Sequence, residues 1–201
     1  METRAVVVVD NSSTILLREN GVWDKIKKMK KKYPVVYAFI DSQNLNLGTS
    51  KNIYRHKKLI YKGWKLDFSK FRRYLQDKFH VKKAFLFIGY VKSNQKLYKF
   101  LKEREYILIF KPTTKDNFGK FKGNVDAELV LHAATIEFPN YEKAVIISGD
   151  GDFYCLHRFL KKKQKLFKII IPNKKSESSL LKPFQEYKLF ITREKEKLEI
   201  K

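Results

Sequence analysis

The chain has 201 residues, of which 43% are hydrophobic and 32% are charged. This length suits one domain with a short extension, and the hydrophobic fraction excludes a wholly disordered chain. The formal net charge is +23, from 44 Lys and Arg against 21 Asp and Glu. Such an excess predicts a positive surface that attracts polyanions, nucleic acid first among them.

Cysteine content and hydropathy bear on the compartment. The single cysteine, Cys155, excludes an internal disulfide and a multi-cysteine zinc site, and it fits a reducing environment. The apolar run Ala5–Val9 is followed at once by Asp10 and lacks a secretory cleavage signature. No stretch approaches the roughly 18 apolar residues of a membrane helix. We expect a cytoplasmic protein that does not contact a membrane, and the sequence leaves open whether it is a homo-oligomer.

Residues 1–34 differ from the rest of the chain. A short strand is expected over Val6–Val9 and a polar turn over Asn11–Thr14, before a basic run from Lys25 to Lys32. We interpret the segment as a basic N-terminal extension. Its lysines are typical of a solvated helix face, and they would also widen a polyanion-binding surface.

From Val35 onward, apolar runs rich in β-branched and aromatic residues alternate with amphipathic stretches, which predicts a parallel α/β sheet. The expected strands are Val35–Ile40, Ala84–Gly89, Tyr106–Phe110, Ala144–Ser148 and Phe167–Ile171. The expected helices are Asp67–Lys78, Asn94–Glu105, Gly123–Glu137 and Phe153–Lys163. Because the strands are almost continuously apolar, both faces of the sheet should be covered, and right-handed crossovers place helices on both.

The connection 46–65 is expected to be a long basic loop. Three aromatic residues, Tyr54, Tyr61 and Trp64, are interleaved with its cations. Such a pattern suits single-stranded nucleic acid, since phosphates take the charge and bases stack on rings. An excursion whose aromatic side chains pack on the domain is an equal alternative.

Acidic side chains follow two of the expected strands. Asp41 comes directly after the first strand, and the sequence SGDGDF places Asp150 and Asp152 after the fourth. Ligands of open α/β sheets bind at the carboxyl ends of the strands, so these carboxylates should meet there. Local roles explain the same residues: Asp41 or Asn44 could form an Asx turn or a helix cap, and Asp152 could cap the next helix.

A third acidic element, the sequence KGNVD, opens the expected helix and directs Asp126 toward the same strand ends. Glu128 lies about 200° further round that helix, which keeps it away from an ion bound by Asp126. Converging carboxylates repel one another unless a divalent cation neutralises them. Because the donors are oxygen atoms, the cluster implies Mg²⁺ or Mn²⁺.

Seven residues carry the predicted chemistry. The expected catalytic residues and metal ligands are Asp41, Asp126, Asp150 and Asp152, the last binding directly or through water. The expected substrate-binding residues are Asn44, Ser148 and Lys122. A bound divalent ion activates water and stabilises charge on a phosphodiester oxygen. The four histidines lack metal-ligand spacing, and no phosphate-binding GxxxxGK[ST] loop is present, which argues against an ATPase.

The motifs FIDSQN, KGNVDAELV and SGDGDF, in this order and spacing, resemble the NYN domain family, the LabA-like branch of the PIN-like nucleases. The resemblance covers about residues 35–192. It implies a PIN-like three-layer α/β/α sandwich with a mainly parallel sheet of order 3-2-1-4-5, an acidic metal site and ribonuclease activity. Where many LabA-like sequences carry a further acid six residues after the helix aspartate, this chain has His132.

The expected organisation is a basic extension over 1–34, a nuclease domain over 35–192 and a charged C-terminal tail over 193–201. The expected function is hydrolysis of RNA, single-stranded by preference, by a metal-dependent endoribonuclease. One alternative is a non-catalytic RNA-binding protein with a vestigial site. A metal-dependent phosphatase of the haloacid-dehalogenase type is disfavoured, because Gln43 stands where that class carries a second aspartate.

Overall fold

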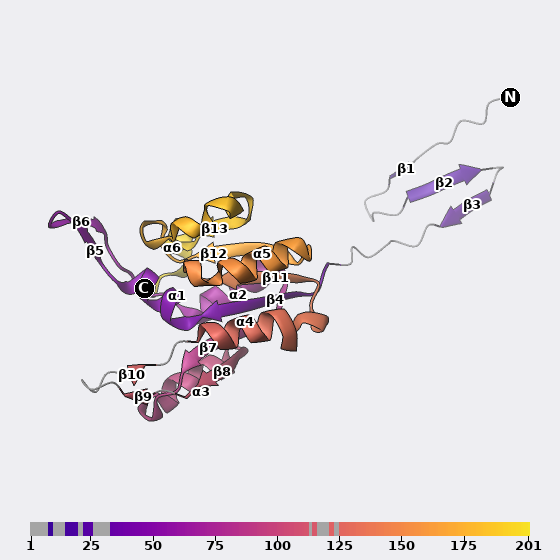
Figure 1. Cartoon of the computed structure of the whole chain (residues 1–201). Helices are drawn as coiled ribbons and strands as arrows, with labels where there is room; N and C mark the ends of the chain where they lie inside the picture. The colour runs from indigo at the N-terminus through magenta and orange to yellow at the C-terminus, as the bar shows by residue number, and fades with distance from the viewer. Residues whose placement is uncertain are drawn as a thin grey trace. The chain divides into compact units, whose positions relative to one another are not determined.

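The structure is a computed structural model that describes residues 33–112 and 125–201, together with the backbone of five short strands in the remaining segments. Two compact units are formed by residues 1–33 and 34–201. In the first unit, three strands form an antiparallel sheet: β1 (Val8–Val9), β2 (Ile15–Glu19) and β3 (Val22–Lys25) (Figure 1). The strands β2 and β3 were not expected. The predicted turn at 11–14 and the lysines at 26–32 lie outside the described residues.

A six-stranded sheet, parallel throughout, forms the centre of the second unit. Its strands are β4 (Val36–Asp41), β7 (Val81–Gly89), β8 (Tyr106–Lys111), β11 (Lys143–Ile147), β12 (Leu166–Ile171) and β13 (Lys188–Phe190). Their order is β13-β12-β11-β4-β7-β8. The first five in chain order therefore follow the expected 3-2-1-4-5 arrangement, and β13 adds an edge strand beside β12.

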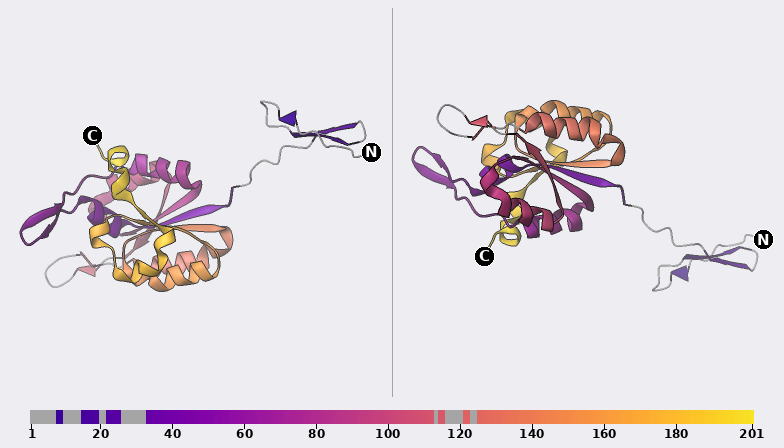
Figure 2. Two further views of the ribbon diagram at one scale, coloured as in Figure 1. Left: turned by 90° about the horizontal axis from the view of Figure 1, so that it is seen from above. Right: turned by 90° about the horizontal axis from the view of Figure 1, so that it is seen from below.

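Helices cover both faces of this sheet (Figure 2). The α-helices are α1 (Ser42–Ser50), α2 (Phe68–Phe79), α3 (Gln95–Glu103), α4 (Asp126–Leu131), α5 (Tyr154–Lys162) and α6 (Lys195–Leu198). The 3-10 segments are η1 (Lys92–Asn94), η3 (Phe138–Asn140), η4 (Gly151–Phe153), η5 (Lys174–Ser176), η6 (Ser179–Tyr187) and η7 (Ile191–Glu194), and η2 (His132–Ile136) is a π-helical turn. Two antiparallel hairpins complete the unit: β5 (Ile53–Arg55) with β6 (Lys58–Tyr61), and β9 (Thr114–Lys115) with β10 (Phe121–Lys122). None of the described helices is long and apolar enough to cross a membrane.

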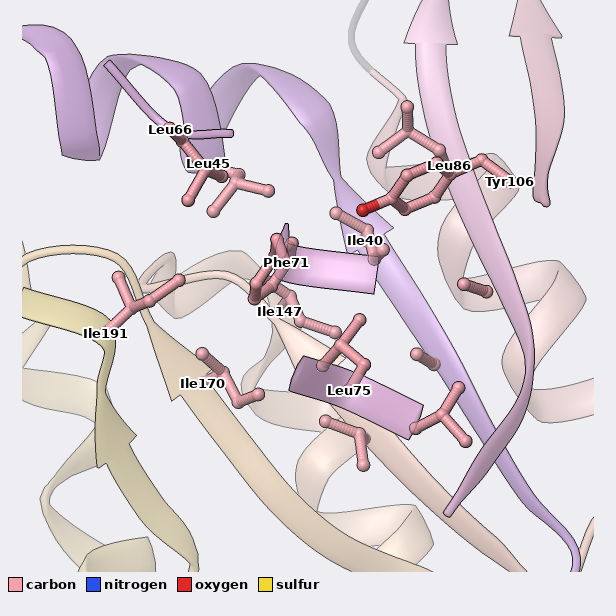
Figure 3. Close-up of a cluster of buried hydrophobic side chains, with 14 of the residues drawn as sticks. Ile40, Leu45, Leu66, Phe71, Leu75, Leu86, Tyr106, Ile147, Ile170 and Ile191 are labelled. Carbon is pink, nitrogen blue, oxygen red and sulfur yellow. The ribbon is translucent and has the colours of Figure 1, made fainter. Parts of the chain in front are cut away.

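Alternate residues of the central strands enter two separate cores. Ile40 and Ile147 point to one face, where they meet Leu75 of α2 (Figure 3). Phe39 and Ile146 point to the other face, toward α4, α5 and η6. This period of two in strands buried on both sides produces the three-layer α/β/α sandwich expected from the sequence.

Two expected segments differ in the structure. The connection 46–65 is not a loop: α1 extends to Ser50, and the hairpin of β5 and β6 follows. The expected tail at 193–201 packs on the domain, with Leu198 2% exposed. Its backbone is held by hydrogen bonds from the Asp67 amide to the Leu198 carbonyl (2.8 Å) and from the Ile200 amide to the Lys65 carbonyl (2.9 Å).

Candidate metal centre

The two central strands, β4 and β11, bring the first and last acidic motifs together. Ile40 and Ile147 are direct partners in the ladder, so Asp41 and Ser148 leave the sheet side by side. Helical crossovers depart to opposite faces here, which makes this the point where strand order reverses. The fold thus places Asp41 at the position where ligands of open α/β sheets bind.

Asp41 ends β4 and also caps α1. Its Oδ1 accepts a hydrogen bond from the Asn44 amide at 3.0 Å, and the residue is only 5% exposed. The second oxygen, Oδ2, lies 3.5 Å from the hydroxyl of Ser148, which donates toward it. The Asp41 carboxylate can therefore cap α1 with one oxygen and take part in the site with the other, although these roles are treated as alternatives in the sequence analysis.

A chain of hydrogen bonds connects Asp41 to the turn after β11. The Ser148 hydroxyl accepts from the amide of Asp150 at 3.2 Å, and the Asn44 Oδ1 accepts from the amide of Gly149 at 2.9 Å. Asn44 thus bridges the two strand ends instead of closing an Asx turn of its own. These contacts fix the relative positions of the first and last acidic motifs.

Asp150 caps the short helix η4, because its Oδ1 accepts from the amide of Asp152 at 3.1 Å. The alternative that Asp152 caps the next helix is wrong, because α5 has Phe153 at its N-cap position and no side chain caps it. Asp152 is exposed, whereas Asp150 is half-buried beside Ser148. Of the two carboxylates in SGDGDF, Asp150 is the one that the backbone holds toward Asp41.

Asp126 begins α4 and acts on Asp41 through its charge. Burial, assisted by the negative charges of Asp126 and Asp150, raises the pKa of Asp41 to about 6 against the hydrogen bond from the Asn44 amide, which lowers it. Three acids are thus electrostatically coupled at one edge of the sheet. Among residues 33–112 and 125–201, however, no three His, Cys, Asp or Glu side chains are gathered as a complete metal-ligand group.

Three other predicted features have different outcomes. The side chain of Lys122 lies outside the described residues. Glu128 pairs with Lys111 at 3.1 Å, in keeping with its exclusion from the ligand set. His132 packs its ring against Phe87, with centroids 5.4 Å apart.

Sequence reasoning missed one wall of this edge, the segment 172–178 that follows β12. A Cβ on Gly48 would lie 2.6 Å from Pro172, and a Cβ on Gly151 would lie 2.3 Å from the Ser178 hydroxyl. The two glycines therefore allow close contact of this segment with α1 and with the SGDGDF turn. The signal was available: the segment follows the fifth expected strand, whose carboxyl end must share this edge.

The donor set fits a hard divalent cation. Carboxylate, hydroxyl and amide oxygens are the ligands that Mg²⁺ and Mn²⁺ prefer. Burial and the neighbouring carboxylates make the charge of Asp41 costly, and a cation would reverse both effects. A cleft of about 610 Å³ lies between α2 and residues 194–198 and is lined by none of the seven predicted residues.

Asp41→Asn should stabilise the metal-free protein by about 3 kcal/mol at pH 7. The pKa of Asp41 is raised from 3.8 to about 6, so the fold favours the protonated carboxyl. The contribution of this carboxyl to the free energy of unfolding is fully present below pH 3.8 and is lost as the pH rises through 6. Asparagine removes the charge, and it is as good a helix cap as aspartate.

Urea unfolding in the presence of chelator measures this gain, with Asp77→Asn on the exposed face of α2 as the matched control. A variant less stable than the wild type would show that the Asp41 charge is not a burden on the fold.

Comparison with known proteins agrees with this geometry. A parallel three-layer sandwich with acids at the carboxyl ends of its central strands is a PIN-like fold. The NYN domain family matches residues 35–188, and the chain belongs to this family of PIN-like nucleases. The crystal structure of a protein of unknown function from Vibrio parahaemolyticus is similar, with a TM-score of 0.65 and 18% identity over 86% of this chain and 99% of that one. A search of curated proteins gave no match.

Proposed function

We propose that the protein is a Mg²⁺- or Mn²⁺-dependent endoribonuclease that hydrolyses single-stranded RNA at the acidic edge. The observation that carries the proposal is the buried carboxylate of Asp41, held between Ser148 and the Asn44 amide and destabilised by Asp126 and Asp150. A fold retains a costly buried charge where a ligand compensates for it. Membership in the NYN family supports the nuclease class.

In this proposal Asp41, Asp126 and Asp150 hold the cation, and the exposed Asp152 joins them directly or through water. A divalent ion at this place supplies a water of lowered pKa and a positive charge for the phosphodiester oxygen. Ser148, which is fully buried, and Asn44 fix the relative positions of the two acidic motifs, and the partly exposed Asn44 also contacts the scissile phosphate. The net charge of +23 draws the polyanion to a protein whose reactive edge is acidic.

A non-catalytic RNA-binding protein with a vestigial site is the second candidate. It is favoured by the lack of a complete acidic ligand group among the described residues. In that case affinity for RNA would come from the lysine-rich surface alone.

Incubation of end-labelled single-stranded RNA with the purified protein separates the two candidates. If the protein is a nuclease, we expect internal cuts in the RNA with Mn²⁺ or Mg²⁺ and none with chelator. RNA binding without cutting under either metal would overturn the proposed activity and favour the second candidate.

A further inference from the structure

The hairpin of β5 and β6 is a concentrated cationic projection. Between positions 51 and 65 the sequence holds six Lys or Arg residues and no Asp or Glu. All six are exposed: Lys51, Arg55, Lys57, Lys58, Lys62 and Lys65. None of them takes part in the ion pairs found among the described residues. The hairpin therefore presents uncompensated charge to solvent.

The turn of this hairpin carries backbone strain in place of favourable turn residues. His56 and Lys57 have φ angles of 47° and 61°, in the left-handed region that two-residue hairpin turns require. Asn-Gly would adopt these angles at little cost, whereas a basic pair costs stability. A hairpin of two exposed strands also gains little from packing. The turn therefore places one cation, Lys57, at the tip of the hairpin in a strained backbone conformation.

Apolar side chains accompany the cations. Tyr54 and Leu59 are cross-strand partners, so their side chains share one face of the hairpin, and they are 61% and 43% exposed. Arg55 and Lys58 are partners on the opposite face. The narrow hairpin thus offers an exposed aromatic ring for a base on one face and cations for phosphates on the other, the two kinds of contact by which proteins hold single-stranded nucleic acid.

The root of the hairpin joins it to the acidic edge. The Thr49 carbonyl accepts from the Trp64 amide at 2.9 Å and from the Tyr61 hydroxyl at 3.0 Å. Trp64 is 4% exposed and anchors the root in the core. Thr49 belongs to α1, which is capped by Asp41 and which approaches Pro172, directly after β12, at Gly48. Figure 1 shows the hairpin extending from this side of the domain.

We propose that the hairpin of β5 and β6 is the arm that grips single-stranded RNA and leads it to the acidic edge. The inference rests on the proposed function. Carboxylates at the edge repel phosphates, so an approaching strand needs attraction from neighbouring cations. The root of the hairpin is separated from Asp41 by α1, which is about 13 Å long, and the tip of the hairpin lies further away. A dinucleotide bound at the acidic edge therefore does not reach the tip of the hairpin.

The test compares two triple variants in chelator, which prevents cleavage. The hairpin variant carries Arg55→Gln, Lys57→Gln and Lys58→Gln. The matched control carries Lys82→Gln, Lys162→Gln and Lys163→Gln, which are exposed at the amino ends of the strands. Anisotropy of a labelled 12-nucleotide single-stranded RNA, measured from low to physiological salt, gives affinity and its salt dependence.

We expect the hairpin variant to lose about 10-fold or more in affinity at 0.15 M salt. The slope of log affinity against log salt should fall by about 2, because each lost phosphate contact removes about 0.7 from it. Tyr54→Ala should weaken binding about 5-fold or more without changing that slope. The control triple should keep the wild-type slope.

Equal losses in both triple variants, or tighter binding to duplex RNA or to phosphatidylserine vesicles, would overturn the hairpin assignment. Cleavage kinetics separate this failure from failure of the nuclease proposal. In an active enzyme, the hairpin variant should have a raised KM for the 12-nucleotide RNA and an unchanged kcat, and dinucleotide cleavage should be unaffected. Hairpin-dependent binding without cleavage would leave the arm in place and remove the nuclease.

Discussion

Asp41→Asn should lower metal-dependent RNA cleavage by about 10²- to 10⁴-fold, since a bound ion stabilises the transition state by several kcal/mol. Asparagine keeps an oxygen that can accept from the Asn44 amide, so α1 remains capped while the negative charge is lost. The substitution thus separates the role of the charge from that of the cap. Single-turnover cleavage of end-labelled RNA at saturating Mn²⁺ measures the effect.

The positions of the other acids predict a ranking. Asp150→Asn should approach the loss seen for Asp41, because Asp150 lies beside Ser148 and its charge acts on Asp41. Asp152→Asn should cost about 10-fold, because Asp152 is exposed and contributes its backbone amide to the turn. Asp77→Asn, the same change on the exposed face of α2, should leave the rate unchanged. Wild-type cleavage by Asp41→Asn would contradict the assignment of the site.

His157 should make the fold sensitive to acid, by about 3 kcal/mol in all. The residue is 0% exposed on α5, its ring lies 5.4 Å from that of Phe184, and neither ring nitrogen has a hydrogen-bond partner among the residues that the structure describes. Burial lowers its pKa from 6.5 to about 4. Stability from the neutral ring is therefore present above pH 6.5 and is lost as the pH falls through 4.

Asp41 opposes this effect in the same pH range. Its raised pKa adds stability as the pH falls from about 6 toward 3.8, by an amount similar to the loss from His157. In acid unfolding of the metal-free wild type, the gain from Asp41 should therefore mask part of the stability lost through protonation of His157. The Asp41→Asn background removes the opposing titration and isolates the histidine.

Urea unfolding at pH 7 and pH 4.5 should compare Asp41→Asn with the double variant Asp41→Asn/His157→Leu. Between these pH values the single variant should lose about 2 kcal/mol more than the double variant. Leucine also removes two unpartnered polar atoms, so the double variant should be at least as stable at pH 7. Parallel pH profiles would show that His157 is protonated in the fold as readily as in the unfolded chain.

The central strands could be predicted because each is buried on both faces and therefore consists of consecutive apolar residues. Their expected bounds are close to those observed, apart from β7, which starts at Val81 and not at Ala84. Lys82 and Lys83 are exposed and interrupt the apolar pattern there. The hairpin of β5 and β6 escaped prediction for the opposite reason: neither strand is buried, so no apolar alternation marks it.

Local backbone geometry at the site could not be predicted from the sequence. The expected helix Gly123–Glu137 is in fact α4 from Asp126, continued by the π-helical turn η2, and the sequence carries no signal for a π turn. Likewise, the sequence suggested a capping role for Asp152 and none for Asp150, whereas the conformation of the glycine turn makes Asp150 the cap of η4. The meeting of Asp41 with the SGDGDF motif followed from topology, because both follow adjacent parallel strands.

Binding of Mn²⁺, followed by electron paramagnetic resonance of the free ion, tests most directly whether the acidic edge is a metal centre. We expect the wild-type protein to deplete free Mn²⁺ and Asp41→Asn to do so far more weakly, while Asp77→Asn behaves as the wild type. Equal depletion by the wild type and Asp41→Asn would place any bound metal elsewhere and contradict the proposed site.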